Sequence, residues 1–257
     1  MQPGPDWGRA PALPRSRPTG TALVIVGCLL AAPAWAAAAH PADAPPIAAR
    51  QEIVRLLAPH TVRARPDVGA GALAVVGDLR PITGARTVLP VLAQRRDDRG
   101  RSWLRVRLPG RALGDDPPPR TGWIRAARAR RSATAWHIAV DLRARRVAVH
   151  RDGRRVRSFR AIVGTPSTPT PRGEHFVEEN VRLPAGRAGA PFALALSARS
   201  AVLQEFDGGP GQIALHGLDN IGGTLGTAAS HGCVRLAGAD IAWLAARIRP
   251  GVPVSIR

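Results

Sequence analysis

The alternation of apolar and polar residues in the C-terminal half of the chain predicts a domain built mainly of β-strands. From Ala135 the segment WHIAVDLRARRVAVHRDGRRVRSFRAIVG follows this period of two, and it predicts three strands, at residues 136–141, 146–150 and 155–163. Asp152-Gly153 lies between the last two strands and is the sequence signal of a two-residue hairpin. A strand at His175–Glu178 is predicted after the Thr/Pro loop TPSTPTPRGEHFV, and VPVSI predicts the closing strand.

One helix is predicted close to the C-terminus, in GADIAWLAARIRPG. The apolar residues Ile241, Leu244 and Ile248 recur there at helical spacing, and Asp240 is the candidate N-cap. The Pro-Gly pair that follows ends the helix. Residues 134–257 are therefore predicted as one compact domain that is mostly β with little helix.

Short strand-like runs separated by turn clusters predict a small β-barrel over residues 67–131. The runs are GALAVVG, RTVLPVLAQ, SWLRVRLPG and TGWIRAAR, and the turn clusters are RRDDRGR and GDDPPPR. WLRVRLPGR followed by GWIRA resembles the bacterial Src-homology-type barrel modules found on cell-wall enzymes. The alternative is that these strands extend the following domain. Residues 40–66 are rich in Ala and Pro and are predicted as a linker or irregular lead-in, with one short helical possibility in PIAARQEIVRLLA.

Residues 1–39 have the pattern of an export signal. Arginines precede an apolar, uncharged run from Thr21 to Ala39, and the tripeptide AWA near its end has the form of a cleavage site. Two alternatives stay open. The run is long enough for an uncleaved membrane anchor, and IVGC resembles a lipobox with Cys28 as the acylated residue. In each case we predict an exported protein, located in the cell wall, the periplasm or at the outer face of the cytoplasmic membrane, which contacts the membrane only if this segment is retained or lipidated.

The chain is strongly basic, with 37 basic and 18 acidic residues and a formal net charge of +19, and every basic side chain is arginine. High Ala, Gly and Pro contents accompany this bias, so the charge is weak evidence for a nucleic-acid ligand. No basic helix with interleaved aromatics and no zinc-finger spacing is present in the sequence, and we predict no nucleic-acid partner. An exported cationic protein suits an anionic extracellular polymer, and a merely solvated basic surface is the alternative.

The residues that could carry nucleophilic chemistry, one cysteine and two histidines, lie in the segment IALHGLDNIGGTLGTAASHGCVRL, residues 213–236. The chain has two cysteines, which excludes a disulfide framework, and if Cys28 is lost or lipidated only Cys233 remains. A thiol attacks as thiolate, and a nearby imidazole can take its proton. His231 stands two residues before Cys233, and His216 stands upstream of a Gly-rich connection that could return the chain to it. Spacing alone does not decide which histidine is the base.

Two other interpretations of this cluster are a structural zinc site and an inert cysteine. A structural zinc site normally takes four ligands, and no fourth ligand is apparent, so we predict no metal and no cofactor. A buried, inert cysteine with two incidental histidines is the other interpretation. The Gly-flanked thiol next to Ser and His disfavours it. The order of residues also differs from papain-like peptidases, because here His216 precedes Cys233.

The segment ALHGLDNIGGTLGTAASHGCVRL resembles the signature of the L,D-transpeptidase (YkuD-type) catalytic domain, and VGTPSTPTPRGEHFV and GGPGQIALHG also fit that family. The resemblance covers residues 135–257. It implies a mixed-sheet β-sandwich with a mobile lid. The loop between His216 and Ser230 is short for the family, and Arg235 stands where some members have Asn.

Carried over by position, the resemblance implies Cys233 as nucleophile and His216 as proton acceptor and donor. It implies that the carbonyl of Gly217 orients the imidazole. The remaining residues of the motif are implied to contact the oxyanion and substrate or to shape the pocket: His231, Gly232, Ser230 and Arg235.

The reaction implied by the resemblance is acyl transfer between peptidoglycan stem peptides, with a donor tetrapeptide and an acceptor amine as partners. A cysteinyl thioester keeps the energy of one peptide bond until the amine arrives, which joins the third residues of two stems. Two alternatives stay open: an L,D-carboxypeptidase on the same fold, in which water resolves the thioester, and a non-catalytic cell-wall-binding protein. The sequence also predicts that residues 134–257 fold and acylate without residues 40–131.

Overall fold

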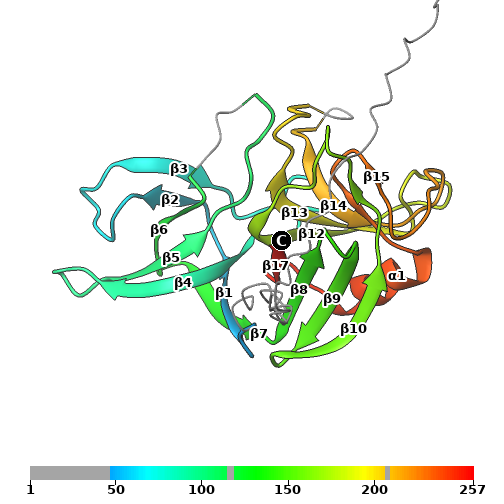
Figure 1. The fold of residues 1–257 in the computed structure, drawn as a ribbon. Helices are drawn as coiled ribbons and strands as arrows, with labels where there is room; N and C mark the ends of the chain where they lie inside the picture. Colours follow the sequence, from blue (N-terminus) through cyan, green and yellow to red (C-terminus); the bar gives the residue numbers. More distant parts are fainter. Residues whose placement is uncertain (1–46, 115–118, 206–208) are drawn as a thin grey trace, which may run out of the picture. The chain divides into compact units, whose positions relative to one another are not determined.

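The computed structural model describes residues 47–114, 119–205 and 209–257. These residues form a seven-stranded sheet, an eight-stranded sheet, a two-stranded sheet and the helix α1 (Figure 1). In the described part of the chain, no helix is long and apolar enough to cross a membrane, and the apolar run predicted as an export signal lies outside it.

The N-terminal sheet is antiparallel throughout, with the strand order β3-β2-β6-β5-β4-β1-β7. Alternate positions of its strands point into one apolar cluster, whose central side chains include Val54, Leu104 and Ile124. The strands are β1 (Gln51–Leu56), β2 (His60–Arg63), β3 (Ala72–Val76), β4 (Val88–Arg96), β5 (Ser102–Arg107), β6 (Thr121–Arg125) and β7 (Ala129–Thr134).

The four runs predicted as strands between residues 67 and 131 are present as β3, β4, β5 and β6. The lead-in predicted for residues 40–66 is wrong over its described part, because residues 51–56 and 60–63 form strands and no helix. Val54 and Leu56 are fully buried with exposed Arg55 between them, a period-two pattern that outweighs the helical propensity of the segment. Residues 40–46 lie outside the described part. A closed barrel of the Src-homology type and the proposed domain boundaries stay predictions.

The C-terminal sheet is mixed, with the strand order β10-β9-β8-β17-β12-β13-β14-β16. The pairs β17–β8 and β14–β16 are parallel and the others antiparallel. Its strands are β8 (Trp136–Asp141), β9 (Arg146–Arg151), β10 (Arg154–Arg160), β12 (Gly173–Arg182), β13 (Phe192–Arg199), β14 (Gln212–His216), β16 (Val234–Arg235) and β17 (Pro253–Ile256). The separate pair β11 (Val163–Gly164) and β15 (Ala228–Ser230) is parallel. The predicted fold class, mainly β with a mixed sheet and one short C-terminal helix, is confirmed.

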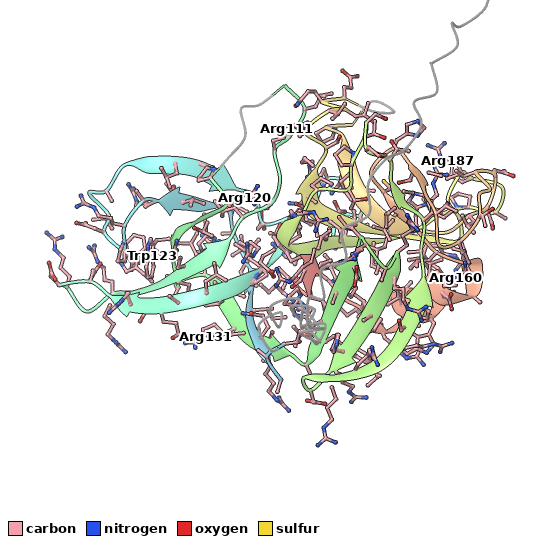
Figure 2. The ribbon with its side chains drawn as sticks, viewed as in Figure 1. Arg111, Arg120, Trp123, Arg131, Arg160 and Arg187 are labelled. Carbon is pink, nitrogen blue, oxygen red and sulfur yellow. The ribbon has the colours of Figure 1, made fainter. Side chains whose placement is uncertain are left out.

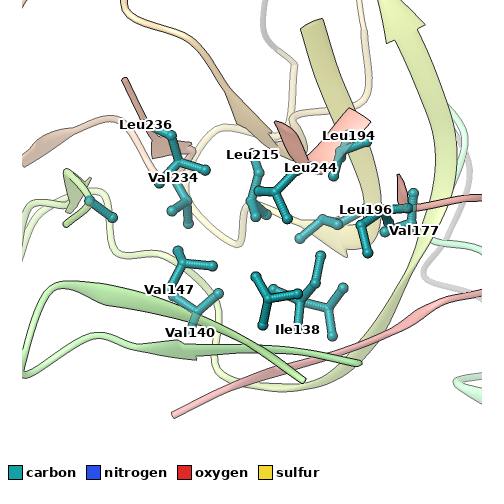
Figure 3. Close-up of a cluster of buried hydrophobic side chains, with 14 of the residues drawn as sticks. Ile138, Val140, Val147, Val177, Leu194, Leu196, Leu215, Val234, Leu236 and Leu244 are labelled. Atoms are coloured by element: carbon teal, nitrogen blue, oxygen red, sulfur yellow. The ribbon is translucent and has the colours of Figure 1, made fainter. Parts of the chain in front are cut away.

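One apolar cluster fills the space beside this sheet (Figure 3). It joins strands that are far apart in the sequence, because Ile138 of β8, Leu194 of β13 and Val234 of β16 are all fully buried in it. The helix α1 (Gly238–Arg247) adds Ile241 and Leu244 to the same cluster. The strand that carries His216 is therefore fixed by a packed core.

The predicted hairpin is present, with Asp152 and Gly153 at positive φ values of 52° and 76° and Arg151 paired with Arg154. The strand predicted at 155–163 ends at Arg160, and β12 extends beyond the predicted His175–Glu178 at both ends.

The predicted N-cap of the helix is wrong. The helix begins at Gly238, its N-cap is Ala237 without a side-chain hydrogen bond, and Asp240 lies in the first turn. A carboxylate there interacts favourably with the positive end of the helix dipole. Helical spacing predicted the buried face correctly but not the position of the first turn.

Arginine side chains project from the outer surfaces of both sheets, Arg131 from the N-terminal sheet and Arg160 from the C-terminal one among them (Figure 2). Exposed arginines of this kind carry much of the positive charge seen in the sequence.

Strand β12 contributes to the cores of both large sheets. Phe176 is buried in the cluster of the N-terminal sheet, while its neighbour Val177 is buried in that of the C-terminal sheet. Successive residues of a strand point to opposite faces, so one strand can serve two cores. The N-terminal sheet thus packs on a strand of the C-terminal part.

This packing yields a prediction about the isolated C-terminal part. In the full chain, Phe176→Ala should lower the free energy of unfolding by about 3–5 kcal/mol because it empties a fully buried site. In a fragment of residues 134–257 the same substitution should cost less than about 1 kcal/mol, because the phenyl ring is already exposed there. Urea denaturation measures both values, and Val177→Ala is the control, expected to destabilise both proteins. An equal cost of Phe176→Ala in the two proteins would contradict the shared packing.

Candidate active site

Cys233, His216 and His231 line one pocket of about 90 Å³, so the structure brings together the three reactive side chains predicted from the sequence. Arg235 lines the same pocket. The other lining residues are Ser200, Leu203, Gly211, Gln212, Ile213 and Ile221. Ser230, Gly217 and Gly232 lie outside the lining, and their contacts shape the backbone that carries the reactive groups. A larger cavity of about 310 Å³ shares Ser200 with this pocket but does not include the thiol.

The register of β14 against β16 determines this arrangement. Leu215 pairs with Val234 and His216 pairs with Arg235 in a parallel ladder. Leu215 and Val234 are fully buried in the C-terminal core. Side chains alternate along a strand, so His216, the neighbour of Leu215, points away from that core. The Gly-rich connection between the two strands returns the chain, which brings Cys233 into the pocket that His216 lines.

The imidazole of His216 is held by the backbone. Its Nδ1 lies 2.8 Å from the carbonyl oxygen of Gly217. A carbonyl only accepts hydrogen bonds, so Nδ1 carries the proton and the lone pair is left on Nε2. The carbonyl predicted to orient the imidazole is therefore bonded to it, and Nε2 is the nitrogen that can accept a proton.

Two glycines allow the backbone to approach this imidazole closely. A Cβ atom on Gly189, whose φ is +82°, would lie 2.7 Å from His216 Nδ1. A Cβ atom on Gly217 would lie 1.8 Å from the carbonyl oxygen of Ala190. The N–H of Gly217 donates to the carbonyl of Gly189 at 2.8 Å, which holds the two segments together. Sequence reasoning missed Gly189, because nothing in its local sequence separates it from the other glycines.

Burial favours the neutral form of both reactive groups. Burial raises the pKa of the Cys233 thiol above its ordinary value, against the Ala214 N–H and the positive charge of Arg235, which both favour the thiolate. Burial also lowers the pKa of the His216 imidazole, and Arg235 lowers it further while the Gly217 carbonyl acts in the opposite direction. The thiol therefore keeps its proton at neutral pH, and the imidazole is free to accept it.

The turn before the thiol is shaped by Ser230, which is 1 % exposed. Its Oγ donates to the carbonyl of Cys233 at 2.6 Å and accepts from the N–H of Gly232 at 3.2 Å. The carbonyl of Ser230 accepts from the Thr165 N–H at 3.0 Å and from the Thr168 hydroxyl at 3.2 Å. Ser230 thus joins the Thr/Pro loop to the thiol segment, which is a structural role rather than a contact inside the pocket.

Gly232 and the thiol complete this turn. Gly232 has a φ of +118°, which L side chains rarely adopt, and a Cβ atom there would lie 3.0 Å from Ile213 Cδ1. The Sγ of Cys233 lies 3.9 Å from the carbonyl oxygen of Gln212, a long contact for a weak S–H donor. Sequence reasoning missed Gln212, whose contribution to this contact comes from its backbone.

His231 and Arg235 differ from His216 in how they are held. His231 is exposed, and none of the hydrogen bonds among the described residues involves its ring. The backbone of Arg235 pairs with Ile162 in both directions, at 2.9 and 3.0 Å, while its buried Nε has no partner within the described part of the chain. The pocket is therefore lined by an imidazole bonded to the backbone, by an exposed imidazole and by a guanidinium whose Nε has no hydrogen-bond partner among the described residues.

Residues 135–256 match the family model of the L,D-transpeptidase catalytic domain, YkuD. The putative L,D-transpeptidase YkuD of Bacillus subtilis is 30% identical over 121 residues, which are 47% of this chain and 65% of that protein. The Bacillus licheniformis protein of the same name is 31% identical over 121 residues, with the same coverage of this chain and of that protein. The match thus spans slightly less than two thirds of these relatives.

Among solved structures, the L,D-transpeptidase from Mycobacterium smegmatis is 21% identical, with 77% of this chain and 99% of that chain covered and a TM-score of 0.39. L,D-transpeptidase 3 from Mycobacterium tuberculosis, in complex with a faropenem-derived adduct, is 16% identical, with coverage of 66% and 91% and a TM-score of 0.42. These structural likenesses are weak and carry no assignment. Residues 135–256, slightly less than half of the chain, are thus similar in sequence to the YkuD family of L,D-transpeptidase catalytic domains.

Proposed function

We propose that this chain is an exported peptidoglycan L,D-transpeptidase that uses Cys233 as nucleophile and His216 as general base and acid. The observation that carries the proposal is the tautomer of His216, which leaves the lone pair on Nε2, together with the pocket that His216 and Cys233, the only described cysteine, both line. The match of residues 135–256 to the L,D-transpeptidase catalytic domain supplies the class of substrate.

In the first half-reaction, Nε2 of His216 accepts the thiol proton as Sγ attacks the carbonyl of the third residue of a donor stem tetrapeptide. A C–S bond forms and the bond to the terminal D-Ala breaks. The imidazolium returns the proton to the departing amine, so D-Ala leaves as a neutral amine. The raised pKa of the thiol fits this order, because thiolate forms during attack and is not exposed to unproductive reactions in the resting enzyme.

In the second half-reaction, the amine of the third residue of an acceptor stem attacks the thioester. His216 Nε2 takes a proton from the amine, and the thiolate leaves and is reprotonated. The product is an amide between the third residues of two stems. No nucleotide is consumed, since the thioester keeps the energy of the first amide bond.

The negative oxygen of each tetrahedral intermediate needs hydrogen-bond donors in place before it forms. The N–H of Gly232 already donates to Ser230 Oγ at 3.2 Å. We therefore assign the N–H of Cys233 as the donor to the negative oxygen of the intermediate. We assign to Arg235 the attraction of a carboxylate of the stem peptide and to exposed His231 a contact with substrate.

We further propose that this activity takes place outside the cytoplasmic membrane, because of the sequence pattern of residues 1–39, which lie outside the described part.

The decisive experiment is mass spectrometry of muropeptides incubated with the purified protein. With a disaccharide tetrapeptide alone, a transpeptidase yields dimers linked through the third residues, with release of D-Ala. Accumulation of the tripeptide monomer, even with excess acceptor amine, would identify a carboxypeptidase. No change in the tetrapeptide would leave only a binding role.

Substitution of the nucleophile tests the covalent step. Cys233→Ala should abolish both the cross-linked product and any mass adduct on the protein. Cys233→Ser should lower the rate by at least about a thousandfold, because a hydroxyl is far less acidic than a thiol near neutral pH. Product analysis and intact-protein mass spectrometry measure the two effects. Full activity of either variant would exclude the mechanism.

The two histidines are distinguished by pH. In the wild type the lowered pKa of His216 keeps the imidazole neutral, so acylation should hold its plateau as pH falls to 6.5 and decline only below it. His216→Ala should slow acylation and simple alkylation of Cys233 at neutral pH, with recovery as hydroxide replaces the base at higher pH. His231→Ala should weaken acylation by the stem peptide with a smaller effect on alkylation. The reverse pattern would assign the base to His231.

The positioning of the imidazole is tested at two glycines of one loop. Gly189→Ala should lower acylation at least about a hundredfold, because the methyl group displaces His216 from its hydrogen bond and misplaces the base. Gly186→Ala is the matched control. Gly186 has a similar φ of +79°, so it carries the same backbone strain, but its Cβ would only approach Asn220 Nδ2 at 3.9 Å. Equal losses in the two variants would mean that backbone strain, and not the imidazole, sets the effect.

A further inference from the structure

Two adjacent carboxylates of β12, Glu178 and Glu179, are each 1% exposed. The ladder between β12 and β13 shifts register between Val177 and Glu179, so Glu178 is the extra residue of a bulge. Adjacent residues of a regular strand point to opposite faces, whereas a bulge re-aims its side chain. Here both carboxylates reach Arg80, at 2.6 Å for Glu178 and 3.7 Å for Glu179.

The carboxylate of Glu178 is fully compensated by four donors. Its Oε2 accepts from Arg80 Nη2 at 2.6 Å, from Gln212 Nε2 at 2.9 Å and from Arg199 Nη2 at 3.1 Å. Its Oε1 accepts from the N–H of Gly110 at 2.9 Å. A buried carboxylate is tolerated only with such partners, and removal of one group leaves buried charges uncompensated. Two of the donors belong to the N-terminal part of the chain, and two to β13 and β14.

One of these donors leads directly to the thiol. Gln212 is the first residue of β14, the strand that ends at His216, and its Nε2 also donates to the carbonyl of Leu196 at 3.1 Å. The side-chain amide is thus held from two sides. The backbone carbonyl of the same residue lies 3.9 Å from Cys233 Sγ, and Gln212 lines the pocket. The N–H of Ala214, two residues further along β14, favours the thiolate form of Cys233.

From these contacts we infer that Glu178 is a positioning residue, which holds the start of β14 against Cys233 and makes thiol reactivity depend on Arg80 and Gly110. Arg80 and Gly110 hold the carboxylate from the N-terminal part, and the carboxylate holds Gln212. Release of Gln212 lets the start of β14 move away from the thiol. The contact of the thiol with the Gln212 carbonyl and the support of its thiolate by the Ala214 N–H are then weakened together.

Glu179 provides a matched control within the same chain. Its Oε2 accepts from the N–H and the hydroxyl of Thr83, at 2.8 and 2.7 Å. It is as buried as Glu178 and also ties β12 to the N-terminal part, but it has no hydrogen bond to Gln212. A purely structural role of the buried acids predicts equal effects of the two substitutions. The positioning role predicts different ones.

The experiment compares Glu178→Gln with Glu179→Gln in the full chain. The rate of Cys233 alkylation by iodoacetamide is measured from pH 6 to 10 on the folded protein, with peptide mapping to separate Cys233 from Cys28. Acylation by the stem tetrapeptide and thermal unfolding are measured in parallel. We expect both variants to unfold at lower temperature. Only Glu178→Gln should slow alkylation at neutral pH, by about tenfold, and move the midpoint of its pH profile upward.

A second variant keeps the test decisive if Glu178→Gln does not fold. Gln212→Met removes the amide but leaves Arg80, Arg199 and Gly110 on the carboxylate, so it should fold and show the same slower alkylation. Wild-type alkylation in folded Gln212→Met, or equal alkylation rates in Glu178→Gln and Glu179→Gln, would overturn the inference. The inference depends on the proposed function only through the identity of the nucleophile. Alkylation tests it without substrate, so wild-type protein that alkylates normally but is not acylated would refute the proposed function alone.

Discussion

The parallel pairing of β14 with β16 is the constraint on which the candidate site depends. Leu215 and Val234 face each other in one apolar core, and this register turns the neighbouring His216 toward the pocket that Cys233 lines. A register slip of one residue would turn Val234 of β16 out of the core and turn a neighbour, Cys233 or Arg235, into it. Burial of a polar or charged side chain among apolar ones costs free energy, so this register is strongly preferred. The packing of apolar side chains that take no part in the chemistry therefore brings the thiol and the imidazole to one pocket.

The pKa shifts of the two reactive groups in the pocket are caused mainly by their burial. Burial disfavours both charged forms, so it raises the pKa of the thiol and lowers that of the imidazole. A cysteine site with these two shifts rests as a neutral pair, unlike sites in which a thiolate and an imidazolium are preformed. The positive charge of Arg235 then has a double effect. It stabilises the thiolate once the proton has moved, and it disfavours the imidazolium that receives the proton, which promotes return of the proton to the leaving amine.

Much of this arrangement could be predicted from local sequence, because its signals are local. The period-two pattern predicted β8 and β9, the Asp-Gly pair predicted the hairpin between β9 and β10, and the spacing of His216 and Cys233 identified the reactive groups. Other features depend on residues far apart in the chain. The local sequence of β1 does not identify it as a strand, because its partners β4 and β7 lie elsewhere in the sequence. Gly189 matters only because the chain returns His216 beside it, and Glu178 matters only because a bulge turns it toward Arg80 and Gln212.

Strand β12 explains why the N-terminal sheet and the site are physically connected. Phe176 and Val177, adjacent residues of this strand, are buried in the two different cores, so each close-packed core constrains the position of the same strand. The bulge that follows adds a polar connection to this apolar one, because Glu178 bonds groups on both sides. A buried carboxylate with donors from both parts is satisfied only when both parts are in place. The thiol segment is consequently held by the apolar register of β16, by the hydrogen bonds of Ser230 and by the contact with Gln212. Of these three, the contact with Gln212 is the one that leads through Glu178 to the N-terminal sheet.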